Sequence, residues 1–288
     1  MNLEFDSVWR SVGAVDPRKL VEARLQLHWA AQPVMAFADC ALEKMPDDSQ
    51  ANLGWRDDIE AMVGRQRPAG LSAGLRIPDM SLLVFDPHGA IAEETSLDGR
   101  TIDSAVSWLE ETVTTRTGGP PEHSIRIRDY EMPEHPVGAG DTFVTESRPA
   151  YPELARWFAN GNLALNELSS SNAGWAEVRC WPHHFDLGTL ISFESSDDVS
   201  SGRSIGVGMS PGDSWYPEPY FYVNPYGLAD LPADGPALES DGHWHTEGWF
   251  GAVLTATSIV EQPGGSQEAT VLSFLHGAVD AARNLLTA

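Results

Sequence analysis

Strands in this sequence come in runs between long helices rather than alternating with them, and this order constrains the fold most strongly. Residues 15–43 predict a helix with Asp16 as its N-cap and Pro17 in its first turn. Pro33 should kink or divide that helix, because proline cannot donate the next helical hydrogen bond. A long helix therefore opens the first half of the chain.

The rest of the first half predicts a hairpin, an amphipathic helix and an irregular connection. Residues 73–86 and 90–100 are two strand-like segments joined by a Pro-His-Gly turn. Residues 102–113, capped by Thr101, place apolar side chains at helical spacing. Residues 118–149 are rich in Pro and Gly and show no sustained period, so we expect an irregular connection there.

The second half repeats this order of elements. Helices are predicted at 151–170 and 266–288, and strands at 175–181, 185–194, 203–210, 218–226 and 243–254. The expected fold class is α+β, with an antiparallel or mixed sheet flanked by helices. We expect an N-terminal α+β half at 1–117 and a C-terminal α+β half at 150–288. The two could be similar helix-strand-helix halves, within one compact domain overall.

The charge balance excludes several classes of partner. The chain of 288 residues carries 42 acidic and 18 basic residues, for a formal net charge of -24, with no basic cluster. Such a surface repels nucleic acid and anionic membranes, so neither is expected as a partner. The opening MNLEFDSVWR lacks the apolar segment of a secretory signal, so cytoplasmic residence is expected.

Histidines and carboxylates gather in two stretches of the second half. In GHWHTEGWF, an extended strand would point His243, His245 and Glu247 to one side, and in PHHFD it would pair His184 with Asp186. These five residues are the predicted ligands of a divalent transition metal such as Zn, Mn or Fe. The alternative is a solvated or hydrogen-bonded face of an edge strand, because short His-x-His motifs often occur without metal.

A third stretch, SPGDSWYPEPYFYV, combines a turn with alternating aromatic residues. Trp215, Tyr216, Tyr220 and Tyr222 are the predicted ligand-binding residues, because tyrosine offers an apolar ring with a polar tip. The candidate general bases are Glu218, which should share a side with the two later tyrosines, and Asp213 in the turn. The alternative is a partly exposed sheet face without a ligand.

Four stretches of this half also resemble a known group of proteins. CWPHHFDLGTLISF, SIGVGMSPGD, EPYFYVNPY and GHWHTEGWFGAVL resemble a family of uncharacterised bacterial proteins that is defined only as a domain of unknown function. The resemblance covers most of the chain and implies one complete family unit. It implies no activity, ligand or catalytic residue.

Three functions follow from these patterns. The first is a metal-dependent, hydrolase-like enzyme that acts on a small molecule, with the metal activating a water molecule. The second is a metal-free small-molecule-binding protein or enzyme with an aromatic pocket, in which histidines hydrogen-bond or transfer protons. The third is an interaction protein without catalysis. The first two require the three stretches to converge on one site.

Overall fold

The computed structural model describes residues 8–145, 149–170, 174–193, 202–228, 230, 232–238 and 241–287. The chain forms two compact units: unit A comprises Lys19–Ala155 and Arg179–Phe185, and unit B comprises Met1–Arg18, Arg156–Val178 and Asp186–Ala288. Parts of the predicted connection (146–148), of a predicted strand (194) and of the last predicted helix (288) lie outside the described residues. Both units combine helices with antiparallel strands, which confirms the α+β class.

Unit A holds a six-stranded antiparallel arrangement with the strand order β6-β1-β2-β3-β4-β5. Its elements are α1 (Val21–Asp39), β1 (Leu53–Arg56), β2 (Ala61–Gly64), β3 (Ser72–Arg76), β4 (Ser81–Phe85), β5 (Ile91–Ser96), α2 (Ile102–Thr117) and β6 (Arg179–Trp181), with short 3-10 turns η2 (Ser49–Ala51) and η3 (Pro136–Ala139). Helix α1 packs against β2 and β3 and is buried over most of its length.

Local signals in the first half of the chain placed one helix cap correctly, and they failed for the start of α1 and for its division at proline. The Thr101 side chain accepts a hydrogen bond from the Ser104 N–H at 3.2 Å, so the predicted cap of α2 is confirmed. Asp16 instead supports the 3-10 turn η1 (Pro17–Lys19), and α1 begins after Leu20 without a side-chain cap. Pro33 lies inside α1, which therefore is not divided.

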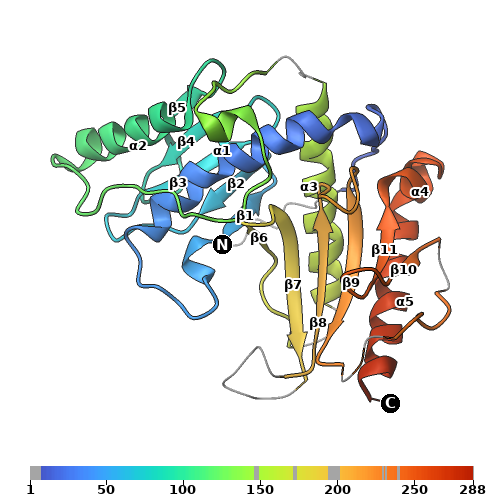
Figure 1. Cartoon of the computed structure of the whole chain (residues 1–288). Helices are drawn as coiled ribbons and strands as arrows, with labels where there is room; N and C mark the ends of the chain where they lie inside the picture. Colours follow the sequence, from blue (N-terminus) through green and yellow to red (C-terminus); the bar gives the residue numbers. More distant parts are fainter. Residues whose placement is uncertain are drawn as a thin grey trace. The chain divides into compact units, whose positions relative to one another are not determined.

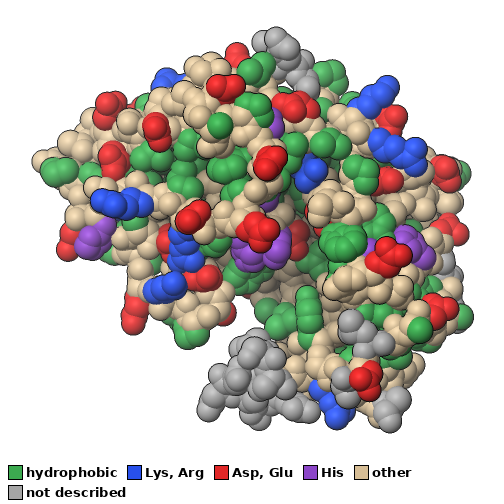
Figure 2. All heavy atoms as spheres, in the orientation of Figure 1, with side chains coloured by type: hydrophobic (Ala, Val, Ile, Leu, Met, Phe, Trp, Pro, Cys, Tyr) green, Lys and Arg blue, Asp and Glu red, His purple; other side chains and the backbone are tan. Residues whose placement is uncertain are grey.

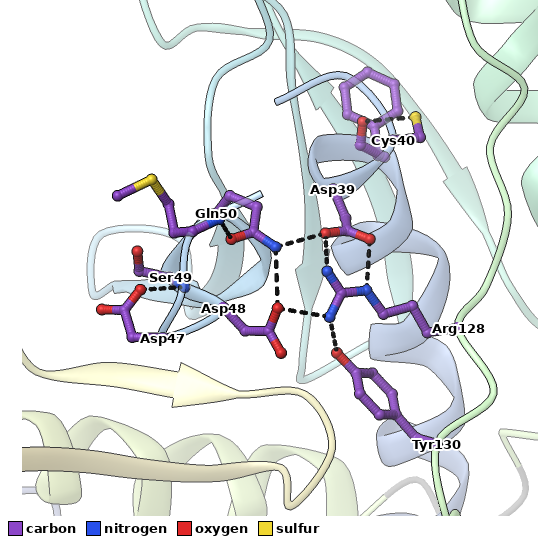
Figure 3. A network of polar contacts seen from close by, with 10 residues as sticks. Asp39, Cys40, Asp47, Asp48, Ser49, Gln50, Arg128 and Tyr130 are labelled. Carbon is purple, nitrogen blue, oxygen red and sulfur yellow. Dashed lines mark hydrogen bonds and ion pairs between the residues drawn. The ribbon is translucent and has the colours of Figure 1, made fainter. Parts of the chain in front are cut away.

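An ion-pair network ties the end of α1 to a distant segment of unit A (Figure 3). The Arg128 Nε donates to Asp39 Oδ2 at 2.7 Å, and a second guanidinium nitrogen bonds the other Asp39 oxygen. A third nitrogen contacts Asp48 at 2.9 Å and donates to the Tyr130 hydroxyl at 3.1 Å. The Gln50 amide donates to Asp39 at 2.8 Å. The network fixes the segment around residue 128 by charge-assisted hydrogen bonds.

Unit B is built on five antiparallel strands in the order β10-β11-β9-β8-β7. Its elements are most of α3 (Ala150–Ser170), β7 (Asp186–Ser192), β8 (Ser204–Ser210), β9 (Tyr220–Tyr226), β10 (His243–His245), β11 (Gly251–Thr255), α4 (Ala256–Val260), η4 (Gly264–Ser266) and α5 (Gln267–Thr287). In Figure 1, α3 runs behind β8 and α5 lies beside β11. Helix α5 contacts β8, β9 and β11.

The face of these strands that α5 covers is apolar. Met209, Phe221 and Leu254 are directly opposite one another on neighbouring strands and are fully buried. A Cβ atom at Gly161 of α3 would lie 3.0 Å from Met209, so α3 packs on the same face. Because strand side chains alternate, the opposite face receives the tyrosines, histidines and carboxylates of unit B.

Within the part of the chain that the structure describes, none of the helices combines the length and the apolar character needed to cross a membrane.

Candidate functional site

One face of the unit B strands carries most of the predicted site residues, and we call it the tyrosine face. Tyr222 of β9 pairs with Gly208 of β8 and Val253 of β11, and Val253 pairs with His243 of β10. Directly opposite residues in an antiparallel pair project to the same side. The tyrosine face therefore includes Asp186, Gly206, Gly208, Ser210, Tyr220, Tyr222, Asn224, Tyr226, His243, His245, Gly251, Val253 and Thr255, together with the adjoining loop residues Asp213, Trp215 and Tyr216.

The Tyr222 side chain crosses the face because β8 has no side chain beneath it. A Cβ atom at Gly208 would lie 2.3 Å from the Tyr222 ring, which shows that the ring lies directly over this glycine. The Tyr222 hydroxyl thereby reaches β7 and donates a hydrogen bond to Asp186 Oδ2. Burial, followed by the charge of Asp186, raises the pKa of Tyr222 well above its usual value, so the phenol keeps its proton.

Asp186 retains one unused acceptor. Its Oδ1 atom is buried, and no residue that the structure describes donates a hydrogen bond to it. A buried carboxylate oxygen without a donor is unfavourable, since the desolvation of the charged group is not offset. A donor supplied from outside the chain would satisfy this oxygen.

Asp213 shapes the loop that carries Trp215 and Tyr216. Its Oδ1 accepts the backbone N–H groups of Trp215 at 2.8 Å and Tyr216 at 2.9 Å, which is an Asx-type turn. Its Oδ2 accepts the Tyr220 hydroxyl at 2.6 Å. Burial and the neighbouring Asp213 raise the pKa of Tyr220. Both carboxylate oxygens therefore hold the loop and β9 in place, and Asp213 remains a predicted base with this positioning role.

Tyr216 lies between the two histidines of β10. Its hydroxyl is 3.0 Å from His243 Nε2 and 3.0 Å from His245 Nδ1, and His245 Nε2 is 2.6 Å from the backbone oxygen of Glu247. Burial raises the pKa of Tyr216, followed by the charge of Asp213. Burial lowers the pKa of His243, as does its neighbour His245, so His243 is neutral near pH 7.

The direction of these hydrogen bonds follows from the Glu247 carbonyl, which can only accept. His245 Nε2 must therefore carry a hydrogen, and in neutral His245 the Nδ1 atom is then an acceptor. The Tyr216 hydroxyl donates to that Nδ1 and accepts in turn from the His243 Nε2–H. The result is a directed chain from His243 through Tyr216 and His245 to the Glu247 carbonyl, in which every hydrogen has an assigned place.

Aromatic rings hold His245 in this position. The Trp249 ring stacks on His245 with centroids 4.2 Å apart and planes 23° apart, and Trp215 meets it edge-on at 5.1 Å. The chain turns back between these rings at Gly248, whose φ of 80° lies in the left-handed region that glycine tolerates. A Cβ atom there would lie 2.7 Å from the Trp215 ring. The orientation of His245 is thus set by packing as well as by hydrogen bonds.

The expected row of three ligands on one strand is wrong in its third member. The predicted strand 243–254 is two strands, β10 and β11, with a turn between them. His243 and His245 do share a face, but Glu247 lies beyond the end of β10 with an exposed side chain. It contributes its backbone oxygen rather than its carboxylate.

The expected strand pairing of His184 with Asp186 is also wrong. Residues 182–185 form a turn between β6 and β7, and Phe185 has a φ of 59°, which breaks strand alternation. The Pro182 carbonyl in this turn accepts hydrogen bonds from His28 and Gln32 of α1, each at 2.9 Å. His184 belongs to unit A and is exposed, whereas Asp186 opens β7 in unit B.

Glu218, the other candidate base, contacts a helix start. Its Oε2 accepts the Thr257 N–H at 2.5 Å and the Thr257 hydroxyl at 2.6 Å, and the residue is buried. A carboxylate in the first turn of α4 satisfies an N–H group that lacks a helical partner. The contacts of Glu218 are therefore those of a helix-capping residue. Its role as a general base stays a prediction.

The predicted metal ligands do not form a cluster. Among the described residues, which include all five of them, no group of three or more His, Cys, Asp or Glu side chains could hold a metal ion. A metal bound by both histidines would occupy the space between His243 Nε2 and His245 Nδ1. The Tyr216 hydroxyl lies there instead and contacts both nitrogens.

Two features of the site were not anticipated from the sequence. One is the role of Trp249, which stacks on His245, and the other is the role of Gly206 and Gly208 as a floor for tyrosine rings. The signal for the second was present: Gly206 and Gly208 alternate on β8, and Tyr220, Tyr222 and Tyr226 lie at alternate positions of β9, with Asn224 between the last two. Such a match indicates that large side chains of one strand lie across its neighbour.

No protein-family model, no curated protein and no solved structure matches this chain.

Proposed function

We propose that the tyrosine face of unit B is a metal-free small-molecule site with acid–base capability. The observation that carries this proposal is the directed hydrogen-bond chain from His243 through Tyr216 and His245 to the Glu247 carbonyl. A third protein ligand beside the two histidines would favour the metal-dependent alternative, and the described residues offer none.

The chemistry of the chain suits proton transfer. A phenol and two imidazoles each both donate and accept, so a proton arriving at His243 can be relayed by shifting its Nε2 hydrogen to Tyr216 and the Tyr216 hydrogen to His245 Nδ1. His245 then holds the extra proton as an imidazolium and keeps its Nε2 hydrogen bond to the Glu247 carbonyl. His243 is the exposed end of the chain, and a bound molecule would meet it first. Histidine is the side chain whose ordinary pKa suits proton exchange near neutral pH.

The surroundings of the chain suit ligand binding. Trp215 is 49% exposed beside His245, and Tyr216 and Tyr222 are part-buried on the same face. Aromatic rings with a few fixed polar groups are typical of small-molecule sites. Asp213 and Tyr220 hold the loop from behind, which limits the reorganisation required on binding.

Four finer expectations belong to the same proposal. We expect cytoplasmic residence. We also expect a ligand other than nucleic acid, because of the net charge of -24. We also retain two related halves, each with a long helix, a run of strands and a closing helix. The likeness of four stretches to an uncharacterised bacterial family stays a prediction, and the proposed site does not depend on that likeness.

A thermal-shift screen against a panel of small metabolites, with metal analysis of the same untagged protein, tests the proposal. We expect at least one metabolite to raise the Tm of the wild-type protein. We also expect metal analysis to find no stoichiometric transition metal in that protein. The affinity for that metabolite should fall about tenfold in Tyr216→Phe, because His243 and His245 lose the hydroxyl that holds both rings in place. Tyr130→Phe is the matched control, since it removes one phenol hydroxyl from the unit A network and should leave ligand affinity unchanged.

Two results would overturn the proposal. One is a stoichiometric transition metal that is lost in a His243→Ala/His245→Ala double variant. The other is a ligand whose affinity responds to Tyr130→Phe as much as to Tyr216→Phe.

A further inference from the structure

The charged groups of the tyrosine face have one sign. Its carboxylates are Asp186 and Asp213, and none of the strand positions that form it carries Lys or Arg. Acidic side chains are also spread over the molecular surface in Figure 2. An anionic ligand would therefore meet like charge both at the face and around it.

The tyrosine rings of the same face are tilted against one another and do not stack face to face. Tyr216 and Tyr220 are tilted by 47° with centroids 4.9 Å apart, and Tyr220 and Tyr222 are tilted by 52° at 6.1 Å. Trp215 and Tyr226 are 49% and 48% exposed. The ring faces of Trp and Tyr attract cations, and Trp does so most strongly.

We propose that the tyrosine face binds a small organic cation, an amine or a quaternary ammonium compound. This inference deepens the proposed function and depends on it. Trp215, Tyr216 and Tyr222 supply the ring faces, and Asp186 supplies the compensating negative charge. The unused acceptor at Asp186 Oδ1 marks where a positive ligand, or an N–H group of one, gains most.

Tyr222 connects the two parts of this recognition. Its ring lies over Gly208 and its hydroxyl bonds Asp186, so the carboxylate and the ring face are held side by side. A cation over the ring would therefore also lie within the field of the carboxylate, whose interaction is strengthened where water is excluded. A neutral ligand of the same shape would gain only the apolar contact.

Three compounds of similar shape and different charge test the proposal. Calorimetric titration compares choline, the neutral 3,3-dimethylbutan-1-ol and the anionic 3,3-dimethylbutanoate, which share a branched head group. We expect choline to bind at least about tenfold more tightly than the alcohol, and the anion to bind most weakly. Raising the salt concentration should weaken choline binding and leave binding of the alcohol nearly unchanged.

Substitutions in the protein separate the contribution of the Tyr222 ring to choline affinity from that of the Asp186 charge. Tyr222→Leu removes the ring and Asp186→Asn removes the charge, and each should weaken choline about tenfold. Tyr222→Phe keeps the ring and frees Asp186, so its choline affinity should stay within about threefold of the natural chain. Asp280→Asn is the matched control for net charge, because Asp280 is exposed on α5, the helix on the opposite face.

The outcomes separate the two proposals. If choline binds no more tightly than the alcohol, the cation assignment is wrong while the small-molecule site stands. If Asp280→Asn weakens choline as much as Asp186→Asn does, the attraction is unspecific and the assignment is again wrong. If none of the three probes binds, the cation assignment fails; if the metabolite screen also finds no ligand, the proposed function fails with it. A variant that loses its cooperative thermal transition is set aside, because the series of three compounds on the unchanged protein tests the assignment without it.

Discussion

The two units each contain a polar network, and the networks differ in what their hydrogens can do. In unit A, Arg128 only donates, and Asp39 and Asp48 only accept, so each hydrogen has one place. In unit B, Tyr216, His243 and His245 each donate and accept. The first network can only hold the fold, whereas the second can pass a proton.

The partners of the two networks reinforce this difference. Arg128 links segments 89 residues apart in the sequence, so its removal would release a long-range tie. Tyr216 links a loop to a strand edge that is exposed at His243. A site that exchanges protons with a ligand must be accessible to that ligand. A structural ion pair is stronger where solvent does not reach it.

The largest expected effect concerns His28, the buried histidine of unit A. Burial lowers the pKa of His28 to about 4, against 6.5 when exposed. As pH falls from about 6.5 to about 4, the unfolded chain gains a proton at this residue and the folded chain does not. His28 should therefore reduce the free energy of unfolding by up to about 3 kcal/mol across that range.

Urea unfolding between pH 7 and pH 4 measures this loss, with His28→Gln as the comparison. Gln can donate to the Pro182 carbonyl as His28 does and cannot be protonated, so its pH dependence should be flatter by about 3 kcal/mol. Parallel pH profiles for the two proteins would show that His28 does not titrate as proposed.

The next largest effect is expected for Arg128→Met. The change leaves Asp39 and Asp48 facing each other without a cation, and both are only partly exposed. We expect a loss of about 2–3 kcal/mol in unfolding free energy. Arg76→Met is the matched control, because Arg76 pairs with the more exposed Asp79 and Glu94, and its loss should stay below about 1 kcal/mol. Equal losses in both variants would contradict a special role for the Arg128 network.

A smaller effect on stability is expected for Tyr216→Phe, at about 1 kcal/mol, because water can replace the hydroxyl at this partly exposed position. The informative change is in the histidines. In nitrogen-15 NMR spectra, His245 should keep hydrogen on Nε2, while its Nδ1 resonance shifts as the Tyr216 donor is lost. An unchanged Nδ1 resonance would rule out the assigned direction of the chain.

The sequence predicted those parts of the site that depend on neighbours in the chain. The alternation of Tyr220 and Tyr222 on one side of a strand, and the pairing of His243 with His245, follow from strand geometry alone. The cap of α2 at Thr101 is equally local. Each is decided by residues within four positions of one another.

The parts that could not be predicted depend on distant contacts or on where a strand ends. The turn at Phe185 is stabilised by His28 and Gln32, which are about 150 residues away in the sequence. The position of Tyr216 between two histidines depends on the pairing of β10 with β11. Pattern alone also did not indicate that Glu218 would cap α4, because Thr257 follows it by 39 residues.

The smallest expected effect distinguishes the carboxylate of Glu247 from its backbone. A metal site would use the Glu247 side chain, whereas the hydrogen-bond chain uses only its carbonyl oxygen, which any residue supplies. Glu247→Gln should therefore change the unfolding free energy by less than about 0.5 kcal/mol. It should also leave the hydrogen of His245 on Nε2, as read from nitrogen-15 NMR. A shift of that hydrogen to Nδ1 would show that the Glu247 side chain acts on His245, and the relay would then end at the carboxylate.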